Sequence, residues 1–291
     1  MIDYASLIPS HVQDIKPSGI RKFFDLVSSN PQAISLTVGE PDFVTPWHIR
    51  MAGIDSLEKG KTYYTANAGL AELRQEIAAY LDRRFGVKYD PVKEIIVTVG
   101  GSEAIDVTFR SLLAPGDEVI IPQPAFVCYE PLARMAGGVP VIINTKNEDN
   151  FRLKAADLEA AITPKTKLVV LPFPNNPTGA VATYDQLKAF VDYALREKAI
   201  IIYDAAYVDY IREEGYPRTI FEIEGAEKCA IEINSFSKNA GFTGVRLGWT
   251  IVPKGLEADN AEPGTIHRLW NRRQCTYFNG ASNVAQAGGI A

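Results

Sequence analysis

The chain has 291 residues, of which 46% are hydrophobic and 22% are charged, and its formal net charge is −5. This composition is typical of a globular protein with one large domain or two ordinary ones. The thinly spread Lys and Arg residues argue against nucleic acid as a partner, and the apolar runs are too short to cross a membrane. Three isolated cysteines and three histidines favour neither a disulfide framework nor a metal site. We expect a cytoplasmic protein.

The N-terminal region, up to about residue 68, predicts an arm followed by a helix and a turn-rich segment, VGEPDFVTP. It contains fewer strand signals than the middle of the chain. We therefore predict that residues 1–45 form an N-terminal arm and part of a small domain, and that residues 46–291 form a large ligand-binding domain.

Short apolar runs that are typical of buried strands dominate the rest of the chain. Helical patterns over residues 102–114 and 183–199 separate some of them. Apolar strands that alternate with helices predict an α/β three-layer sandwich with a mainly parallel sheet, in which ligands bind beyond the carboxyl ends of the strands. The predicted strands cover residues 94–100, 118–124, 166–174, 200–207, 229–236 and 247–253.

The first two strands end in residues with two interpretations each. Gly101 and Ser102 open a helix after the first strand, where free backbone N–H groups suit a phosphate; the alternative is that Ser102 is a plain N-cap. Phe126 follows the second strand and is suited either to stack on a flat ring or to pack in the core.

The next two strand ends offer polar groups. Asn176 follows the third strand in a turn-forming sequence, and its amide is placed to hydrogen-bond a phenolic or carboxylate oxygen. Asp204 ends an apolar strand, with Tyr207 three residues later. A carboxylate there is costly to bury without a cation or a strong donor, so it predicts either a salt bridge, a helix N-cap or a partner for a protonated ring nitrogen.

The fifth strand leads into Lys238, which lies among small residues rather than on a charged surface. The alternatives are an exposed lysine on a turn and a lysine at the mouth of the sheet, where burial and nearby cations lower its pKa and make a nucleophilic amine. Arg246 follows eight residues later and is suited to a phosphate.

Three motifs, PNNPTG (174–179), DAAY (204–207) and SFSKNAGFTGVRLGW (235–249), resemble those of the fold-type I pyridoxal-phosphate-dependent aminotransferases, the aspartate aminotransferase superfamily. Their order and internal spacing agree with the family. The resemblance extends from about residue 18 to residue 291. Residues 18–200 resemble aspartate and aromatic aminotransferases, and residues 201–291 resemble LL-diaminopimelate aminotransferase.

The resemblance implies a role for each matched residue around pyridoxal 5'-phosphate (PLP). Lys238 would bind the cofactor covalently and move a proton at the substrate α-carbon, and Asp204 would pair with the pyridine nitrogen. Tyr207 and Asn176 would hydrogen-bond the phenolic oxygen. The residues implied to bind the phosphate are Gly101, Ser102, Ser235, Ser237 and Arg246.

Further residues match positions that contact the ring, the substrate and a second subunit. Phe126 takes the ring-stacking position, and Gly39 matches a backbone contact to the substrate carboxylate. Tyr64 matches a tyrosine that reaches the phosphate of the neighbouring subunit, and Asn279 is similar to another cross-subunit residue near the substrate. The resemblance therefore implies a homodimer with shared active sites.

The activity that the resemblance implies is ping-pong transfer of an amino group between an L-amino acid and a 2-oxo acid such as 2-oxoglutarate, with lysine biosynthesis as one setting. A β-lyase or decarboxylase is an alternative with the same cofactor. The family's C-terminal small domain carries an arginine for the substrate carboxylate, and this chain stops at Ala291, before it. We therefore expect weak transamination, and the other alternative is a PLP-binding truncated, composite or regulatory domain.

Overall fold

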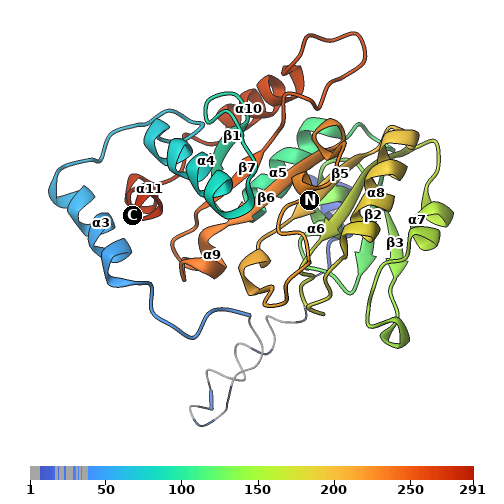
Figure 1. Ribbon diagram of the computed structural model, residues 1–291, viewed down its shortest axis with the longest axis horizontal. Coiled ribbons are helices and arrows are strands. Elements are labelled where there is room, and N and C mark those ends of the chain that lie inside the picture. Colours follow the sequence, from blue (N-terminus) through green and yellow to red (C-terminus); the bar gives the residue numbers. More distant parts are fainter. Residues whose placement is uncertain are drawn as a thin grey trace, which may run out of the picture.

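A single mixed β-sheet of seven strands organises the computed structural model of the chain (Figure 1). The structure describes residues 7–16, 19, 23, 29, 30, 32, 34 and 39–291. The strand order is β1-β7-β6-β5-β4-β2-β3, with helices on both faces. The predicted α/β three-layer sandwich is confirmed. The strands are β1 (Ile95–Thr98), β2 (Glu118–Gln123), β3 (Val139–Asn144), β4 (Thr166–Pro172), β5 (Ile200–Asp204), β6 (Ala230–Ser235) and β7 (Gly248–Ile251).

All strands run in the same direction except β7, which is antiparallel to both of its neighbours, β1 and β6. The other pairings are parallel. The carboxyl ends of β1, β5 and β6 therefore lie at the same edge of the sheet. This edge receives the residues that follow each of these strands, as the sequence analysis predicts.

Strand β3 is absent from the predicted strands. Its sequence, VPVIIN, contains Pro140 and is only partly buried. Proline cannot donate to a neighbouring strand, so it is tolerated where one side of the strand has no partner. The structure places β3 at the end of the sheet, paired with β2 alone.

The helices α5 and α8 correspond to the two predicted helices, while α4, α6, α7 and α10 were not predicted. At the start of α8, Thr183 and Gln186 form a reciprocal capping box: the Thr183 Oγ1 accepts from the Gln186 N–H at 3.3 Å, and the Gln186 Oε1 accepts from the Thr183 N–H at 2.9 Å. Among the described helices, none is long and apolar enough to cross a membrane. The helices are α1 (Ser10–Gln13), α3 (Trp47–Glu58), α4 (Ala71–Phe85), α5 (Gly101–Leu112), α6 (Tyr129–Met135), α7 (Ala155–Ala161), α8 (Tyr184–Glu197), α9 (Phe236–Asn239), α10 (Thr265–Tyr277) and α11 (Asn283–Ile290).

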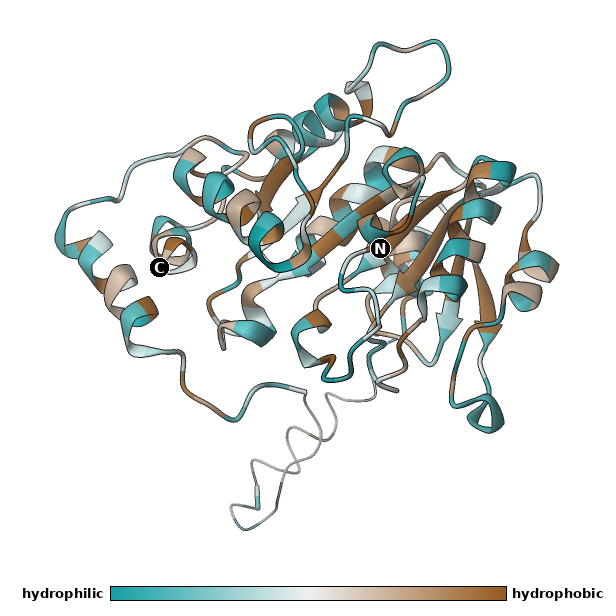
Figure 2. Cartoon of the chain, in the orientation of Figure 1, coloured by the Kyte–Doolittle hydropathy of each residue, from teal (hydrophilic) through white to brown (hydrophobic). Residues whose placement is uncertain are grey.

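The core lies on both faces of the sheet because successive residues of a strand point to opposite sides. In β4, Val169 and Leu171 join the cluster beneath α8, whereas Leu168 and Val170 join the cluster with α5 and Trp270 of α10. Figure 2 shows the strands as largely hydrophobic along their length. The doubly covered sheet explains why the strand sequences are continuous apolar runs rather than alternating patterns.

The helices α3 and α11 lie side by side at one end of the molecule, and β3 and α7 lie at the other (Figure 1). Gly53 of α3 packs closely on α11, because a Cβ atom there would lie 3.2 Å from a Val284 methyl carbon. Of the predicted arm over residues 1–45, the positions 1–6, 17, 18, 20–22, 24–28, 31, 33 and 35–38 lie outside the described residues. The division into an arm and a large domain therefore stays a prediction.

A buried carboxylate, Glu232, lies in the middle of β6 and is 1% exposed. Its Oε2 accepts hydrogen bonds from the Thr219 hydroxyl at 2.5 Å and the Ile220 N–H at 3.0 Å, and its Oε1 accepts one from the Asn234 amide at 2.8 Å. Burial nevertheless raises the pKa of Glu232 to about 7, because the three donors offset only part of the lost hydration.

This raised pKa predicts a pH dependence of stability. Between the ordinary pKa of 4.5 and about 7, the folded chain holds a proton that the unfolded chain has lost, so the free energy of unfolding falls as the pH rises. Over this pH range the free energy of unfolding falls by about 3 kcal/mol. Urea unfolding at a series of pH values should show this slope, and Glu232→Gln should remove it. The exposed Glu224→Gln serves as the matched control, and an unchanged slope in Glu232→Gln would contradict the assignment.

Candidate functional site

The first turn of α5 lies directly against the side chain of Arg246. Gly100, the N-cap, has a φ of 81°, and a Cβ atom there would lie 2.6 Å from the Arg246 Nη2. Glycine is therefore required both for the backbone conformation and for the close approach. The N-cap is Gly100, so the alternative interpretation of Ser102 as the N-cap is wrong. Gly101 and Ser102 instead form the first residues of the helix, beside a guanidinium.

The Arg246 side chain is positioned by an unusual backbone conformation and by hydrogen bonds. Its backbone is left-handed, with a φ of 65°, which is uncommon for a residue with a side chain. Its Nη1 donates to the Thr243 carbonyl at 2.9 Å and lies 3.5 Å from the Ser237 hydroxyl. The Ser235 hydroxyl accepts from the Ser237 N–H at 3.1 Å and so caps α9. A guanidinium, hydroxyl groups and a helix N-terminus together form a site suited to a dianion.

Asp204, at the end of β5, is held by two hydrogen bonds. Its Oδ2 accepts from the Tyr129 hydroxyl at 2.7 Å, and its Oδ1 accepts from the Ala206 N–H at 3.0 Å. Burial raises the pKa of Asp204, and the two donors oppose that rise. Among the described residues, no cationic side chain forms an ion pair with Asp204. Of the predicted alternatives, the salt bridge is therefore wrong for this part of the chain, and a cationic ligand would stabilise the carboxylate.

Tyr129 is the site residue that the sequence analysis missed. It is 1% exposed and packs edge to face on Phe126, with ring centroids 5.7 Å apart. Its role depends on a hydrogen bond to a residue 75 positions away, so the local sequence carried no signal for it. Phe126 itself is partly buried against the core cluster around α5, so it both packs and borders the site.

Lys238 extends from α9 toward Tyr207 and Gly39. Its Nζ donates to the Gly39 carbonyl and lies 5.0 Å from the centroid of the Tyr207 ring. Burial lowers the pKa of Lys238; Glu40 raises it, and Arg246 lowers it further. A lowered pKa increases the fraction of neutral amine, which is the nucleophilic form. The expectation of a lysine at the mouth of the sheet agrees with this placement.

Asn176 is positioned by its neighbour. The Asn175 Oδ1 accepts from the Thr178 N–H at 3.2 Å and from the Thr178 hydroxyl at 3.1 Å, and these bonds fix the turn after β4. The side-chain amide of Asn176 has no hydrogen-bond partner within the described part of the chain, and the residue is partly exposed. Its amide therefore stays available to a ligand oxygen, while Asn175 satisfies the turn.

Tyr64 and Asn279 are not brought to this site. Tyr64 is 85% exposed, and Asn279 is also exposed. Within the described ranges, neither forms a hydrogen bond, ion pair or ring contact with Lys238, Asp204 or Arg246. Their segments are neighbours on the surface, because the Asn67 amide donates to the Phe278 carbonyl at 3.2 Å. Their predicted roles in a second subunit stay predictions.

The residues present fit the three chemical parts of PLP. The α5 N-terminus and Arg246 suit its phosphate, and Gly100 lets the Arg246 guanidinium lie directly against this N-terminus. The unpaired carboxylate of Asp204 suits a protonated ring nitrogen. The partly buried amine of Lys238 suits an aldehyde. Each group lies at the carboxyl edge of the sheet.

Comparisons with known proteins agree with this arrangement. Residues 31–287 match the family model described as aminotransferase class I and II. The chain is 46% identical to the YugH protein of Bacillus subtilis over 251 residues, which are 86% of this chain and 65% of YugH. It is 38% identical to the LL-diaminopimelate aminotransferase of Protochlamydia amoebophila over 278 residues, 89% of this chain and 64% of that protein.

A solved structure also superposes closely. Aspartate aminotransferase from Thermus thermophilus with maleate has a TM-score of 0.86 and is 31% identical; the match covers 97% of this chain and 72% of that chain. The chain therefore belongs to the aminotransferase class I and II family, whose members depend on PLP. It spans less than two thirds of the length of YugH and of the Protochlamydia protein.

The hydrogen bond from Tyr129 predicts the effect of removing its hydroxyl. Tyr129→Phe leaves the ring but takes one of two donors from Asp204, so the pKa of Asp204 rises and its attraction for a protonated ring nitrogen weakens. We expect PLP affinity to fall roughly tenfold, as for a bond to a charged group. A spectroscopic PLP titration measures this loss. Tyr193→Phe, on the outer helix α8, is the control, and equal affinities would show that the bond is unimportant.

Proposed function

We propose that the chain binds PLP through Lys238 and transfers amino groups between an L-amino acid and a 2-oxo acid. The observation that carries this proposal is the common placement of Lys238, Asp204 and Arg246 at the carboxyl edge of the sheet. The membership of the class I and II family supports it. The amine, the carboxylate and the guanidinium are contributed by separate segments of the chain, so their meeting depends on the fold.

Each residue has a task that follows from its environment. Arg246 and the first turn of α5 hold the phosphate, and Asp204, kept in place by Tyr129, holds a proton on the ring nitrogen. Tyr207 and Asn176 hydrogen-bond the phenolic oxygen. When bound, PLP supplies an electron-withdrawing ring that stabilises negative charge at the substrate α-carbon. The neutral amine of Lys238 takes a proton from that carbon and returns one.

The amino donor and acceptor use this site in turn, in a ping-pong sequence with 2-oxoglutarate as an acceptor. Gly39 lies beside both Lys238 and Tyr207, since a Cβ atom on it would lie 3.5 Å from the Tyr207 hydroxyl, and this position supports its predicted contact with the substrate carboxylate. The names of the relatives support aspartate and LL-diaminopimelate as donors, the latter in lysine biosynthesis.

We also propose that two copies of the chain form a dimer with shared sites. Large side chains are exposed around the segments of Tyr64 and Asn279: Trp47 is 64%, Leu57 53%, Tyr63 66% and Tyr277 66% exposed. These residues lie on adjoining elements, because α3 packs on α11 and the Asn283 amide of α11 donates to the Tyr63 carbonyl at 2.7 Å. Large exposed apolar side chains on adjoining elements are typical of a protein interface.

Lys238→Ala should abolish covalent PLP binding, because it removes the partly buried amine with the lowered pKa. Wild-type protein loaded with PLP and reduced with borohydride should carry the added mass on the peptide that contains Lys238. Lys254→Ala, which removes an exposed lysine paired with Asp90, is the control. Labelling of another lysine in the wild type would refute the assignment. Adding aspartate, tyrosine or LL-diaminopimelate to the loaded protein should change its visible spectrum, and the fastest change identifies the donor.

A subunit-mixing experiment tests the shared site. Tyr64→Phe should weaken PLP binding in its own homodimer if the hydroxyl reaches the phosphate of the neighbour. In hybrids with Lys238→Ala subunits, the site that retains Lys238 receives an intact Tyr64, so tight covalent binding should return. Hybrids with the Lys238→Ala/Tyr64→Phe double variant should show no recovery. Absence of recovery in the first hybrid would place Tyr64 outside the neighbouring site.

A further inference from the structure

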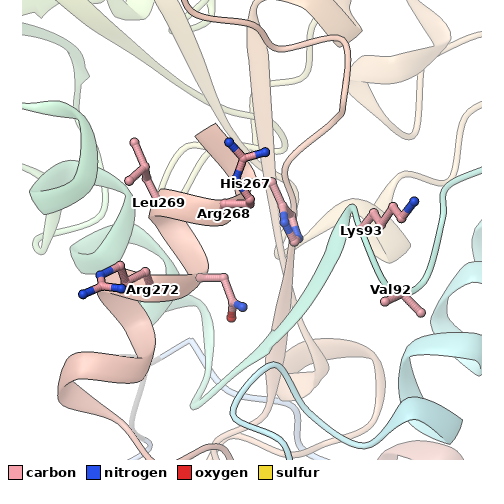
Figure 3. Close-up of a pocket in the computed structure, with 7 residues that line it drawn as sticks. Val92, Lys93, His267, Arg268, Leu269 and Arg272 are labelled. Atoms are coloured by element: carbon pink, nitrogen blue, oxygen red, sulfur yellow. The ribbon is translucent and has the colours of Figure 1, made fainter. Parts of the chain in front are cut away.

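A pocket lies at the opposite edge of the sheet from Lys238, between α10 and the turn that precedes β1 (Figure 3). It is an open hollow of about 540 Å³. The pocket borders the turn at the amino end of β1, whereas Lys238 follows the carboxyl end of β6, so this pocket is separate from the candidate PLP site. The residues that line it are Val92, Lys93, His267, Arg268, Leu269, Asn271 and Arg272.

The charged residues that line this pocket are all basic. Lys93 and Arg272 form no ion pair with any described residue. Arg268 donates to the Thr265 hydroxyl at 2.8 Å and lies 3.6 Å from the exposed carboxylate of Glu262. The Lys93, Arg268 and Arg272 side chains are all exposed, and their charged ends point in different directions in Figure 3. A bound anion would attract each of them, and the attraction is strongest for Lys93 and Arg272, which have no carboxylate partner among the described residues.

His267 adds a buried polar group to the wall of the pocket. It is 8% exposed, and its Nε2 has no hydrogen-bond partner among the described residues. Burial lowers the pKa of His267; the carboxylates of Glu94 and Asp90 oppose this effect, and the cations Arg74 and Lys254 add to it. A negative charge in the pocket would stabilise the protonated ring and raise this pKa.

The start of α10 also favours an anion in this pocket. Gly264 caps the helix with a φ of 75°, there is no side-chain cap, and the first turn contains no acidic residue. The positive end of the helix dipole is therefore not neutralised by its own turn. His267 and Arg268 lie in that first turn of the thirteen-residue helix.

We propose that this pocket binds a small oxyanion with more than one negative charge, namely phosphate or a phosphate monoester. Figure 3 shows Lys93 and Arg272 on opposite sides, with His267 and Arg268 between them. An anion with several oxygens can accept from groups spread in this way, and the long side chains can turn toward it at a modest cost in rotamer freedom. The amide of Asn271 supplies a further neutral donor.

Histidine NMR tests the proposal directly, because the chain has three histidines, His11, His48 and His267. PLP-loaded protein is titrated with inorganic phosphate at constant ionic strength, and in a parallel arm with glycerol phosphate. The His267 signals should shift to saturation while those of His11 and His48 stay unchanged. The pKa of His267, measured with sulfate whose charge is constant over the titration, should rise. Tighter binding of glycerol phosphate would identify a monoester as the ligand, and equal or weaker binding would identify free phosphate.

Variants separate a specific site from general charge effects. Arg268→Ala combined with Arg272→Ala should weaken binding by at least about tenfold, because two charge-assisted contacts are lost. Arg273→Ala is the matched control: it lies on the same helix, but its guanidinium is stacked on Tyr277, 4.0 Å from the ring centroid. Equal affinity in the double variant and the wild type, or a His267 shift produced equally by chloride, would overturn the proposal.

Discussion

The contact between the Arg246 guanidinium and Gly100 is the interaction on which the candidate site depends. It joins the loop after α9 to the first turn of α5, two segments that are far apart in the sequence. Because the guanidinium occupies the space in which a side chain at Gly100 would lie, the helix N-terminus and the cation share one location. The left-handed backbone of Arg246 is uncommon for a residue with a side chain, and its hydrogen bond to the Thr243 carbonyl helps to hold it.

The same edge of the sheet also contains two ionisable groups of opposite charge. Asp204 is a carboxylate in a poorly hydrated position, and Lys238 is an amine in a similar one; burial destabilises the charged form of both. Neither is neutralised by pairing with the other. Tyr129 and Ala206 supply neutral donors to the carboxylate, and the Gly39 carbonyl accepts from the amine. This arrangement leaves both charges ready to interact with a ligand rather than with each other.

The strand ends could be predicted from the sequence because continuous apolar runs identify doubly covered strands, and polar residues directly after them must lie at the sheet edge. Lys238, Asp204 and Asn176 were found in this way. Tyr129 was missed because its hydrogen bond to Asp204 joins two strand ends across the sheet, and nothing local to either segment records it. Strand β3 was missed because Pro140 argues against a strand until its place at the end of the sheet is known. The hydrogen bond that joins α10 to α5, from the Trp270 indole N–H to the Thr108 hydroxyl at 2.9 Å, also links residues that are far apart in the sequence.

The antiparallel strand β7 has a consequence for how the site is assembled. It separates β1, which leads to the first turn of α5, from β6, which leads to Lys238. Neighbouring strands are about 4.8 Å apart, so two hydrogen-bonded spacings place these strands about 10 Å from each other. The segments that follow them nevertheless meet beyond the sheet, because the Arg246 guanidinium lies against Gly100 and 3.5 Å from the Ser237 hydroxyl. One long side chain therefore closes the gap that β7 opens between the two segments.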